Sequence, residues 1–197
     1  ILFINLFFSN SLVGKIDIIT TNDLHGHISP QYAKFMNPNH PALMVGGAGL
    51  YKYKNDLNKK SLLFDAGNFF QGHPIGIIDS GKTIIEWMNK LEYNALVPGK
   101  DDFILGYKNL VNLSKLAKFP FLASNIKYSD NDEYVFNPYT IINYDEIRIG
   151  ILGIVSSNIH DFVLAKNIDG IDFLSERLAL DTWLPKLKDL NVDIIIV

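Results

Sequence analysis

Three short segments carry residue types that could bind a metal ion or a phosphate group. Residues 22–26 (NDLHG), 65–68 (DAGN) and 99–102 (GKDD) each follow a run of mainly apolar residues. Asp23 and His25 are two residues apart, so an extended segment projects both side chains to one side. Zn²⁺ and Mn²⁺ accept such a mixed set of oxygen and nitrogen ligands. Taken singly, each segment has an ordinary alternative, as a turn or as a solvated charged loop.

The three segments lie where strands are expected to end. Short β-branched runs predict strands, and runs with apolar residues three and four apart predict helices. The expected strands are residues 16–20, 61–65, 93–97, 121–125, 140–144, 147–155 and 192–197, and the expected helices are residues 48–60, 83–91, 107–118 and 178–190. Pro185 would kink or split the last helix.

The alternation of strands and helices predicts an α/β fold with mostly parallel strands. A hairpin turning at Asp145 and Glu146 adds antiparallel pairing, so the sheet is expected to be mixed. Ligand sites of open α/β sheets form at the carboxyl ends of the strands. The three polar segments are therefore expected to meet there.

Composition excludes several classes of function. The 197 residues contain no cysteine, so disulfides, thiolate metal sites and thiol nucleophiles are excluded. The net charge of −3 and the absence of a dense Lys/Arg cluster argue against a nucleic-acid partner. Neither a Gly-x-Ser-x-Gly nucleophile elbow nor a phosphate-binding P-loop occurs in the sequence.

The two ends of the chain carry their own signals. Residues 1–8 are mainly apolar and are followed by a small-x-small pattern at residues 9–11, so we interpret residues 1–14 as the remnant of a signal peptide. Export to the periplasm or the extracellular space is then expected; a buried first strand is the alternative. The run is too short for a membrane span, which needs ~20 apolar residues. Because residues 194–197 are as apolar as a central strand, we interpret the chain as a fragment or an interrupted copy.

In their order along the chain, these motifs resemble one known family. Residues 17–28 (DIITTNDLHGHI) are similar to the opening block of the 5′-nucleotidase and UDP-sugar hydrolase family. Residues 46–48, 62–72 and 93–103 resemble its glycine pair and its next two blocks, and residues 122–126 and 151–155 resemble two later strands. The resemblance implies a four-layer α/β/β/α metallophosphoesterase sandwich with mixed sheets. Residues 15–197 would form this domain, incomplete at its C-terminus and without the family's nucleotide-recognition domain.

The resemblance also implies roles for individual residues. The family holds two divalent cations of the Zn, Mn or Mg type, which share a bridging carboxylate. Asp23 and His25 match the ligands of the first cation, whereas Asn68 stands at the bridging position. Lys100 stands where the family has an asparagine ligand of the second cation, and Asp101 stands at the position of a catalytic histidine. An amide is a neutral donor, and an ammonium group donates hydrogen bonds but cannot ligate a metal.

Several functional interpretations follow from this resemblance. The family implies metal-dependent hydrolysis of phosphoesters in nucleotide catabolism, with a nucleotide or a phosphate ester as substrate. The chain itself is expected to be weakly active or inactive. The alternatives are a non-catalytic protein that binds a nucleotide or a surface partner, and a product that does not fold stably.

Lys100 and the other histidines have open alternatives too. Lys100 either replaces the second cation as a fixed positive charge that binds phosphate, or pairs with a neighbouring aspartate. His27 and His73 are either groups that support the site or exposed loop residues. His40 and His160 are expected in loops.

Overall fold

The computed structural model describes residues 16–57 and 61–197. The interpretation of residues 1–14 as a signal-peptide remnant, and its alternative of a buried first strand, lie outside the described residues. The end of the helix expected over residues 48–60 also falls partly outside them.

The described strands form two three-stranded sheets and two short ribbons. The first sheet has the order β1-β4-β5 and is parallel, and the second has the order β10-β8-β7, with one parallel and one antiparallel pair. The ribbons β2-β3 and β6-β9 are antiparallel. The strands are β1 (Asp17–Thr21), β2 (Gln31–Tyr32), β3 (Leu43–Met44), β4 (Ser61–Asp65), β5 (Ala95–Leu96), β6 (Ile126–Tyr128), β7 (Tyr139–Tyr144), β8 (Ile147–Leu152), β9 (Ile171–Phe173) and β10 (Ile194–Ile196).

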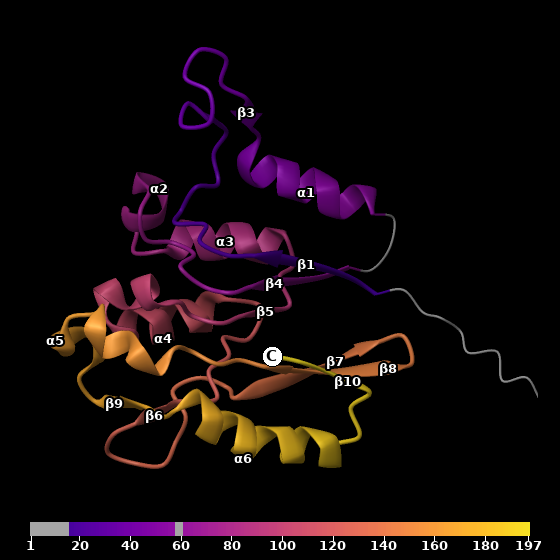
Figure 1. Cartoon of the computed structure of the whole chain (residues 1–197), viewed down its shortest axis with the longest axis vertical. Coiled ribbons are helices and arrows are strands. Elements are labelled where there is room, and N and C mark those ends of the chain that lie inside the picture. Colours follow the sequence, from indigo (N-terminus) through magenta and orange to yellow (C-terminus); the bar gives the residue numbers. More distant parts are fainter. Residues whose placement is uncertain (1–15, 58–60) are drawn as a thin grey trace, which may run out of the picture.

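Helices cover the outer faces of both sheets. They are α1 (Gly46–Asp56), α2 (Pro74–Ile77), α3 (Lys82–Lys90), α4 (Tyr107–Leu116), α5 (Ala165–Ile168) and α6 (Glu176–Asp189), with the 3₁₀ helices η1 (Lys100–Leu105) and η2 (Ser157–Asp161). Figure 1 shows α3 above the first sheet, the second sheet below it, and α6 beneath the second sheet. This arrangement is the expected α/β/β/α sandwich, in which the second sheet is mixed as expected and the first is purely parallel.

The side chains of β4 point alternately to the two faces of the first sheet, and both faces are buried. Leu62 and Phe64 are buried in a cluster that also contains Ile149 and Ile151 of β8, so this cluster fills the space between the sheets. Leu63 points to the opposite face and joins the larger core. Side chains of α3 and α4 complete that core, namely Ile84, Ile85, Met88, Leu110 and Leu113.

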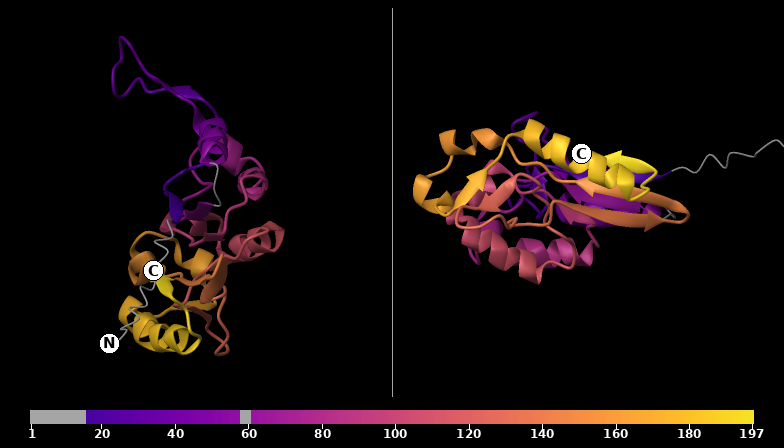
Figure 2. Two further views of the ribbon diagram at one scale, coloured as in Figure 1. Left: turned by 90° about the vertical axis from the view of Figure 1, so that its right-hand side faces the viewer. Right: turned by 90° about the horizontal axis from the view of Figure 1, so that it is seen from below.

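Helix α6 covers the outer face of the second sheet, as the view from below shows (Figure 2). A Cβ placed at Gly150 of β8 would lie 3.2 Å from a methyl group of Leu187, so the glycine lets the helix approach the strand closely. Pro185 lies inside α6, and the helix continues through it, so the predicted split is wrong. Among the described residues, the helices are all too short or too polar to cross a bilayer.

Most of the predicted elements are confirmed, with shifted ends. The hairpin is confirmed, because Tyr144 pairs with Ile147 across a two-residue turn. The strand predicted over residues 121–125 is wrong: Phe121 and Leu122 make only isolated bridges. These residues are apolar because they are buried in the core, and burial alone does not supply a paired neighbour.

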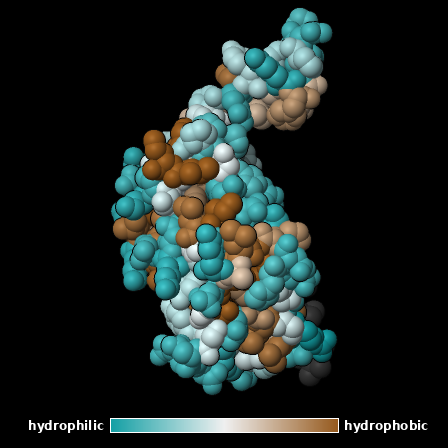
Figure 3. Space-filling model, turned by 90° about the vertical axis from the view of Figure 1, so that its left-hand side faces the viewer, coloured by the Kyte–Doolittle hydropathy of each residue, from teal (hydrophilic) through white to brown (hydrophobic). Residues whose placement is uncertain are grey.

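The register of the first sheet positions the polar loops. Thr21 pairs with Asp65, and Asp65 pairs with Leu96, so the three parallel strands end in one row. The loops that follow them therefore start at the same edge of the sheet. Figure 3 views the molecule from the side on which α2 and α5 lie, where apolar and hydrophilic patches adjoin one another.

Candidate functional site

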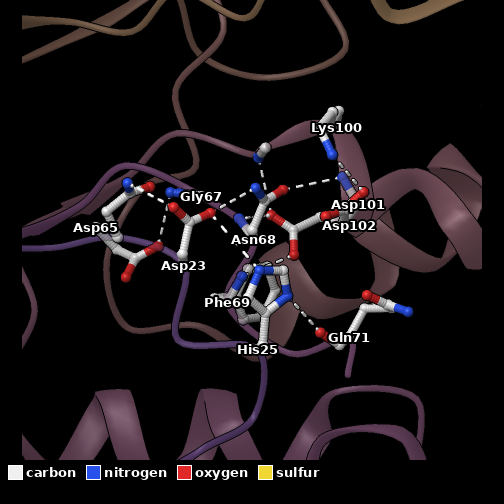
Figure 4. Close-up of polar contacts among 12 residues, drawn as sticks. Asp23, His25, Asp65, Gly67, Asn68, Phe69, Gln71, Lys100, Asp101 and Asp102 are labelled. Carbon is white, nitrogen blue, oxygen red and sulfur yellow. Dashed lines mark hydrogen bonds and ion pairs between the residues drawn. The ribbon is translucent and has the colours of Figure 1, made fainter. Parts of the chain in front are cut away.

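The three polar loops meet at the carboxyl edge of the first sheet, as their order predicted. The backbone N–H of Asp23 donates to the carbonyl of Gly67 at 3.0 Å, and that of His25 donates to the carbonyl of Asn68 at 2.8 Å. Beside them, the N–H of Val97 donates to the carbonyl of Asp65 at 2.9 Å. Figure 4 shows the side chains of these loops converging on Asn68.

Three residues of this cluster have an uncommon backbone conformation. Asp23, His25 and Asn68 have φ angles of 52°, 46° and 57°, in the left-handed region that side chains other than glycine's disfavour. The extended conformation expected for Asp23 and His25 is therefore wrong, because the backbone of both residues is left-handed. Such residues persist only where surrounding contacts hold them, and they gather at functional sites. The hydrogen bonds between the loops supply these contacts.

Asp23 and His25 present a pair of ligand atoms. Nδ1 of His25 lies 2.7 Å from the carbonyl oxygen of Gln71, which can only accept, so this nitrogen carries the proton. In the neutral imidazole Nε2 then carries the free lone pair, and it lies 3.7 Å from Oδ1 of Asp23. A carbonyl that fixes the tautomer of a histidine is the usual support of a metal ligand.

Asn68 uses both ends of its side-chain amide. Its Nδ2 donates to Oδ1 of Asp23 at 2.7 Å, and its Oδ1 accepts the backbone N–H of Asp101 at 2.9 Å. Because one partner can only accept and the other can only donate, the amide has one orientation. The amide proton thus lies on the same Asp23 oxygen that faces Nε2 of His25.

Lys100 and Asp101 form an ion pair at the rim of the site. The Nζ–Oδ1 distance is 3.0 Å, and the two side chains are 44% and 32% exposed. The ammonium also lies 5.5 Å from the ring centroid of Phe162. This pairing with a neighbouring aspartate is one of the two alternatives that the sequence left open for Lys100.

Asp102 is the residue of the site that sequence reasoning missed. The sequence pattern predicts a solvated charged loop at this position, yet Asp102 is fully buried. Its carboxylate accepts the backbone N–H groups of Asn68, Phe69 and Gly99 at 2.7, 2.9 and 2.8 Å. Burial raises the pKa of Asp102 to about 8, against these three donors, which lower it. Asp102 is the third residue of η1, and its bond to the N–H of the N-cap residue Gly99 forms only one half of a capping box, so the sequence pattern does not distinguish it from Asp101.

A second buried carboxyl group lies at the end of β4. Thr21 donates to Oδ2 of Asp65 at 2.6 Å, and the N–H of Gly67 donates to Oδ1 at 2.9 Å. Burial raises the pKa of Asp65 to about 6, although both hydrogen bonds lower it. Burial also raises the pKa of Tyr93, whose hydroxyl lies 2.9 Å from that of Thr21.

We expect this buried carboxyl group to make stability depend on pH. The pKa of Asp65 is about 6 in the folded protein, against 3.8 for an unperturbed aspartate. The folded state therefore holds the proton more tightly than the unfolded state, and the stability that this contributes below pH 4 is lost as the pH rises through 6. Relative to an Asp65→Asn variant, the free energy of unfolding should fall by about 3 kcal/mol between about pH 4 and about pH 7. Urea unfolding of both proteins across this range measures the difference, and parallel curves would contradict the expectation.

The remaining histidines lie outside the cluster of Asp23, His25 and Asn68. The rings of His27 and His73 are 4.8 Å apart, and Nδ1 of His73 accepts the N–H of Ile75 as the N-cap of α2. The pKa of His27 is lowered, mainly by partial burial and then by electrostatic repulsion from His73 and His25. His40 lies in an exposed loop as expected, whereas the prediction that His160 lies in a loop is wrong, because it lies in η2.

The residues at this site fit half of a metal centre and do not fit a pair of cations. Asp23 and the free Nε2 of His25 could ligate one ion. Asn68 points an N–H group, not an oxygen, toward the Asp23 carboxylate, so it offers no ligand atom there. Lys100 carries an ammonium group, which cannot ligate a second ion. In the part of the chain that the structure describes, groups of three or more potential histidine or carboxylate ligands at metal-binding distances are absent.

Comparisons with known proteins identify relatives of the sequence. No protein-family model matches the chain. The 5′-nucleotidase of Homo sapiens is 30% identical over 193 residues, which cover 92% of this chain and 33% of that protein. The trifunctional nucleotide phosphoesterase protein YfkN of Bacillus subtilis is 28% identical over 203 residues, 92% of this chain and 14% of that protein. The chain thus spans about a third of the length of the 5′-nucleotidases it matches.

Solved structures share the fold. A putative 5′-nucleotidase from Staphylococcus aureus superposes with a TM-score of 0.76 at 23% identity, covering 91% of this chain and 36% of that one. The calcineurin-like phosphoesterase YfkN from Bacillus subtilis superposes with a TM-score of 0.72 at 25% identity, covering 91% and 60%. The described fold is therefore that of the phosphoesterase domain in these proteins.

Proposed function

From its similarity to the N-terminal phosphoesterase domain of the 5′-nucleotidases, we propose that this chain descends from metal-dependent hydrolases of nucleotide phosphoesters. We also propose that the chain itself releases little or no phosphate. The relatives named above are phosphoesterases, which supports the descent. The activity of this chain depends on its own residues.

The contact between Asn68 and Asp23 is the observation that carries the proposal. Two dications at close range need a shared anionic oxygen, because their mutual repulsion is offset only by negative ligands. Asn68 supplies no negative charge, and its N–H group already occupies the Asp23 oxygen nearest His25. The ammonium group of Lys100 offers no lone pair to a second cation beside the same loops.

An assay of phosphate release tests this proposal. The purified protein, supplied with Mn²⁺, Zn²⁺ or Mg²⁺ and with AMP, a UDP-sugar or a generic phosphate ester, should release no phosphate above the blank. An Asp23→Ala variant serves as the matched control, since it removes one of the two remaining ligands. Metal-dependent turnover that disappears in this variant would overturn the proposal.

A non-catalytic role in binding a nucleotide or a phosphate ester is the second candidate. It is supported by the partly exposed ammonium of Lys100, which lies beside an exposed aromatic ring. The carboxylate of Asp101 competes with any phosphate for this ammonium. If the second candidate is right, Lys100→Ala should weaken phosphate binding, and equal affinity in the two proteins would contradict it. A phosphate titration of the two proteins decides, and a tenfold or greater loss of affinity in Lys100→Ala would establish Lys100 as a phosphate ligand. An Asp101→Ala variant should then bind phosphate more tightly than the unmodified protein.

We also propose that residues 15–197 belong to a phosphoesterase domain that is exported. The apolar run at residues 1–8 supports export, and so do the small residues that follow it. Sequencing the N-terminus of the protein purified from its host tests this: cleavage near residue 14 supports it, and an intact apolar run in the mature protein contradicts it.

A further inference from the structure

Asn68 joins the loops that follow all three strands of the first sheet. Its amide contacts Asp23 and the backbone of Asp101, while its backbone N–H is bound by Asp102. We propose that this neutral amide keeps the loop cluster closed without any cation, so that Asn68 is a positioning residue and the cluster's stability is independent of divalent metal ions. The proposal concerns how the loops are held and does not rest on whether the protein hydrolyses phosphoesters.

The charges around Asn68 require a neutral group that donates and accepts. Asp23 lies on one side at hydrogen-bond distance, and Asp101 lies on the other, with its carboxylate paired to Lys100. A carboxylate at position 68 would still accept the N–H of Asp101. It would lose the donor to Asp23 and would place two negative charges where the N–O distance is now 2.7 Å.

The strained backbone of the cluster raises the cost of losing this contact. Asp23, His25 and Asn68 all have left-handed φ angles, which are unfavourable for these residues unless neighbouring contacts hold them. The Asn68 amide connects the side chain of Asp23 to the backbone of Asp101 in η1. Removing the amide therefore takes away one of the contacts that hold strained backbone in two loops, beside the backbone hydrogen bonds that remain.

A single substitution should convert the closed cluster into one that needs a cation. With aspartate at position 68, the cluster would offer two carboxylates and the free Nε2 of His25, a ligand set that suits Mn²⁺ or Zn²⁺. A cation bound there would neutralise the repulsion between the carboxylates. A ligand that binds only the folded state raises its stability, so the melting temperature should rise with cation concentration.

Thermal unfolding in EDTA and in 1 mM Mn²⁺ tests the proposal. The unmodified protein should melt at the same temperature in both, within about 1 °C. Asn68→Asp should melt about 8 °C lower in EDTA and recover most of this loss in Mn²⁺. Asn112→Asp, which adds the same charge on the exposed face of α4, serves as the control and should change the melting temperature by less than about 1 °C in either buffer.

The double variant Asp23→Asn/Asn68→Asp keeps the test decisive if the single variant fails to fold. It restores one amide and one carboxylate with their roles exchanged, so it should melt within about 3 °C of the unmodified protein and ignore Mn²⁺. Two results would overturn the proposal: a rise of several degrees for the unmodified protein in Mn²⁺, or an exchanged pair no more stable in EDTA than Asp23→Asn alone.

Discussion

Replacing Asp102 with alanine is expected to lower the free energy of unfolding by about 4 kcal/mol. The carboxylate accepts three backbone N–H groups from two loops, and it is fully buried. Its removal leaves these donors without partners at a place that water does not reach, and each such group costs about 1–3 kcal/mol. Urea unfolding followed by circular dichroism measures the loss.

Its neighbour provides the matched control for this experiment. Asp101 pairs with Lys100 at the surface, and exposed ion pairs contribute at most about 1 kcal/mol, so Asp101→Ala should lose less than that. Asp102→Asn keeps one acceptor oxygen and should fall between the two. If Asp102→Ala is no less stable than Asp101→Ala, Asp102 does not hold the loops together.

Replacing Gly67 with alanine is the second substitution with a large expected effect, a loss of about 4 kcal/mol. Its φ angle is +100°, which alanine rarely adopts. A Cβ at this position would overlap the backbone nitrogen of Gly99 and lie 2.6 Å from its Cα. Because the obstructing atoms belong to backbone, they cannot rotate away, and the loops after β4 and β5 must separate.

A second glycine isolates the part of this loss that comes from crowding. Gly170 has a φ angle of +94°, and a Cβ there would meet only the hydroxyl of Tyr107, at 3.3 Å. Gly170→Ala should therefore cost only the backbone strain, about 1–2 kcal/mol. Equal losses for the two variants in urea unfolding would show that the approach of the two loops does not depend on Gly67.

Much of the fold followed from local sequence patterns. The strand predicted over residues 61–65 coincides with β4, because a short apolar run bounded by polar residues describes a buried strand well. The ribbons β2-β3 and β6-β9 were not predicted. Their strands are two or three residues long, too short for a periodic pattern to appear. Pairing of such strands is set by contacts with distant segments.

The site was predictable in its position but not in its contacts. Parallel strands that end in one row bring their loops together, so the meeting of residues 22–26, 65–68 and 99–102 could be expected. The different environments of Asp101 and Asp102 could not. The two are identical in type and adjacent, yet one faces solvent and the other points under the loops, and only the path of the backbone decides which.

The central claim is that Asn68 prevents two cations from sharing these loops. The most direct measurement is a crystal structure of the protein grown in millimolar Mn²⁺, with anomalous scattering used to locate the ion. The account predicts the Asn68 amide on Asp23, as in the present structure, and no pair of ions between the loops. Two well-occupied Mn²⁺ ions with Asn68 in contact with both would contradict it.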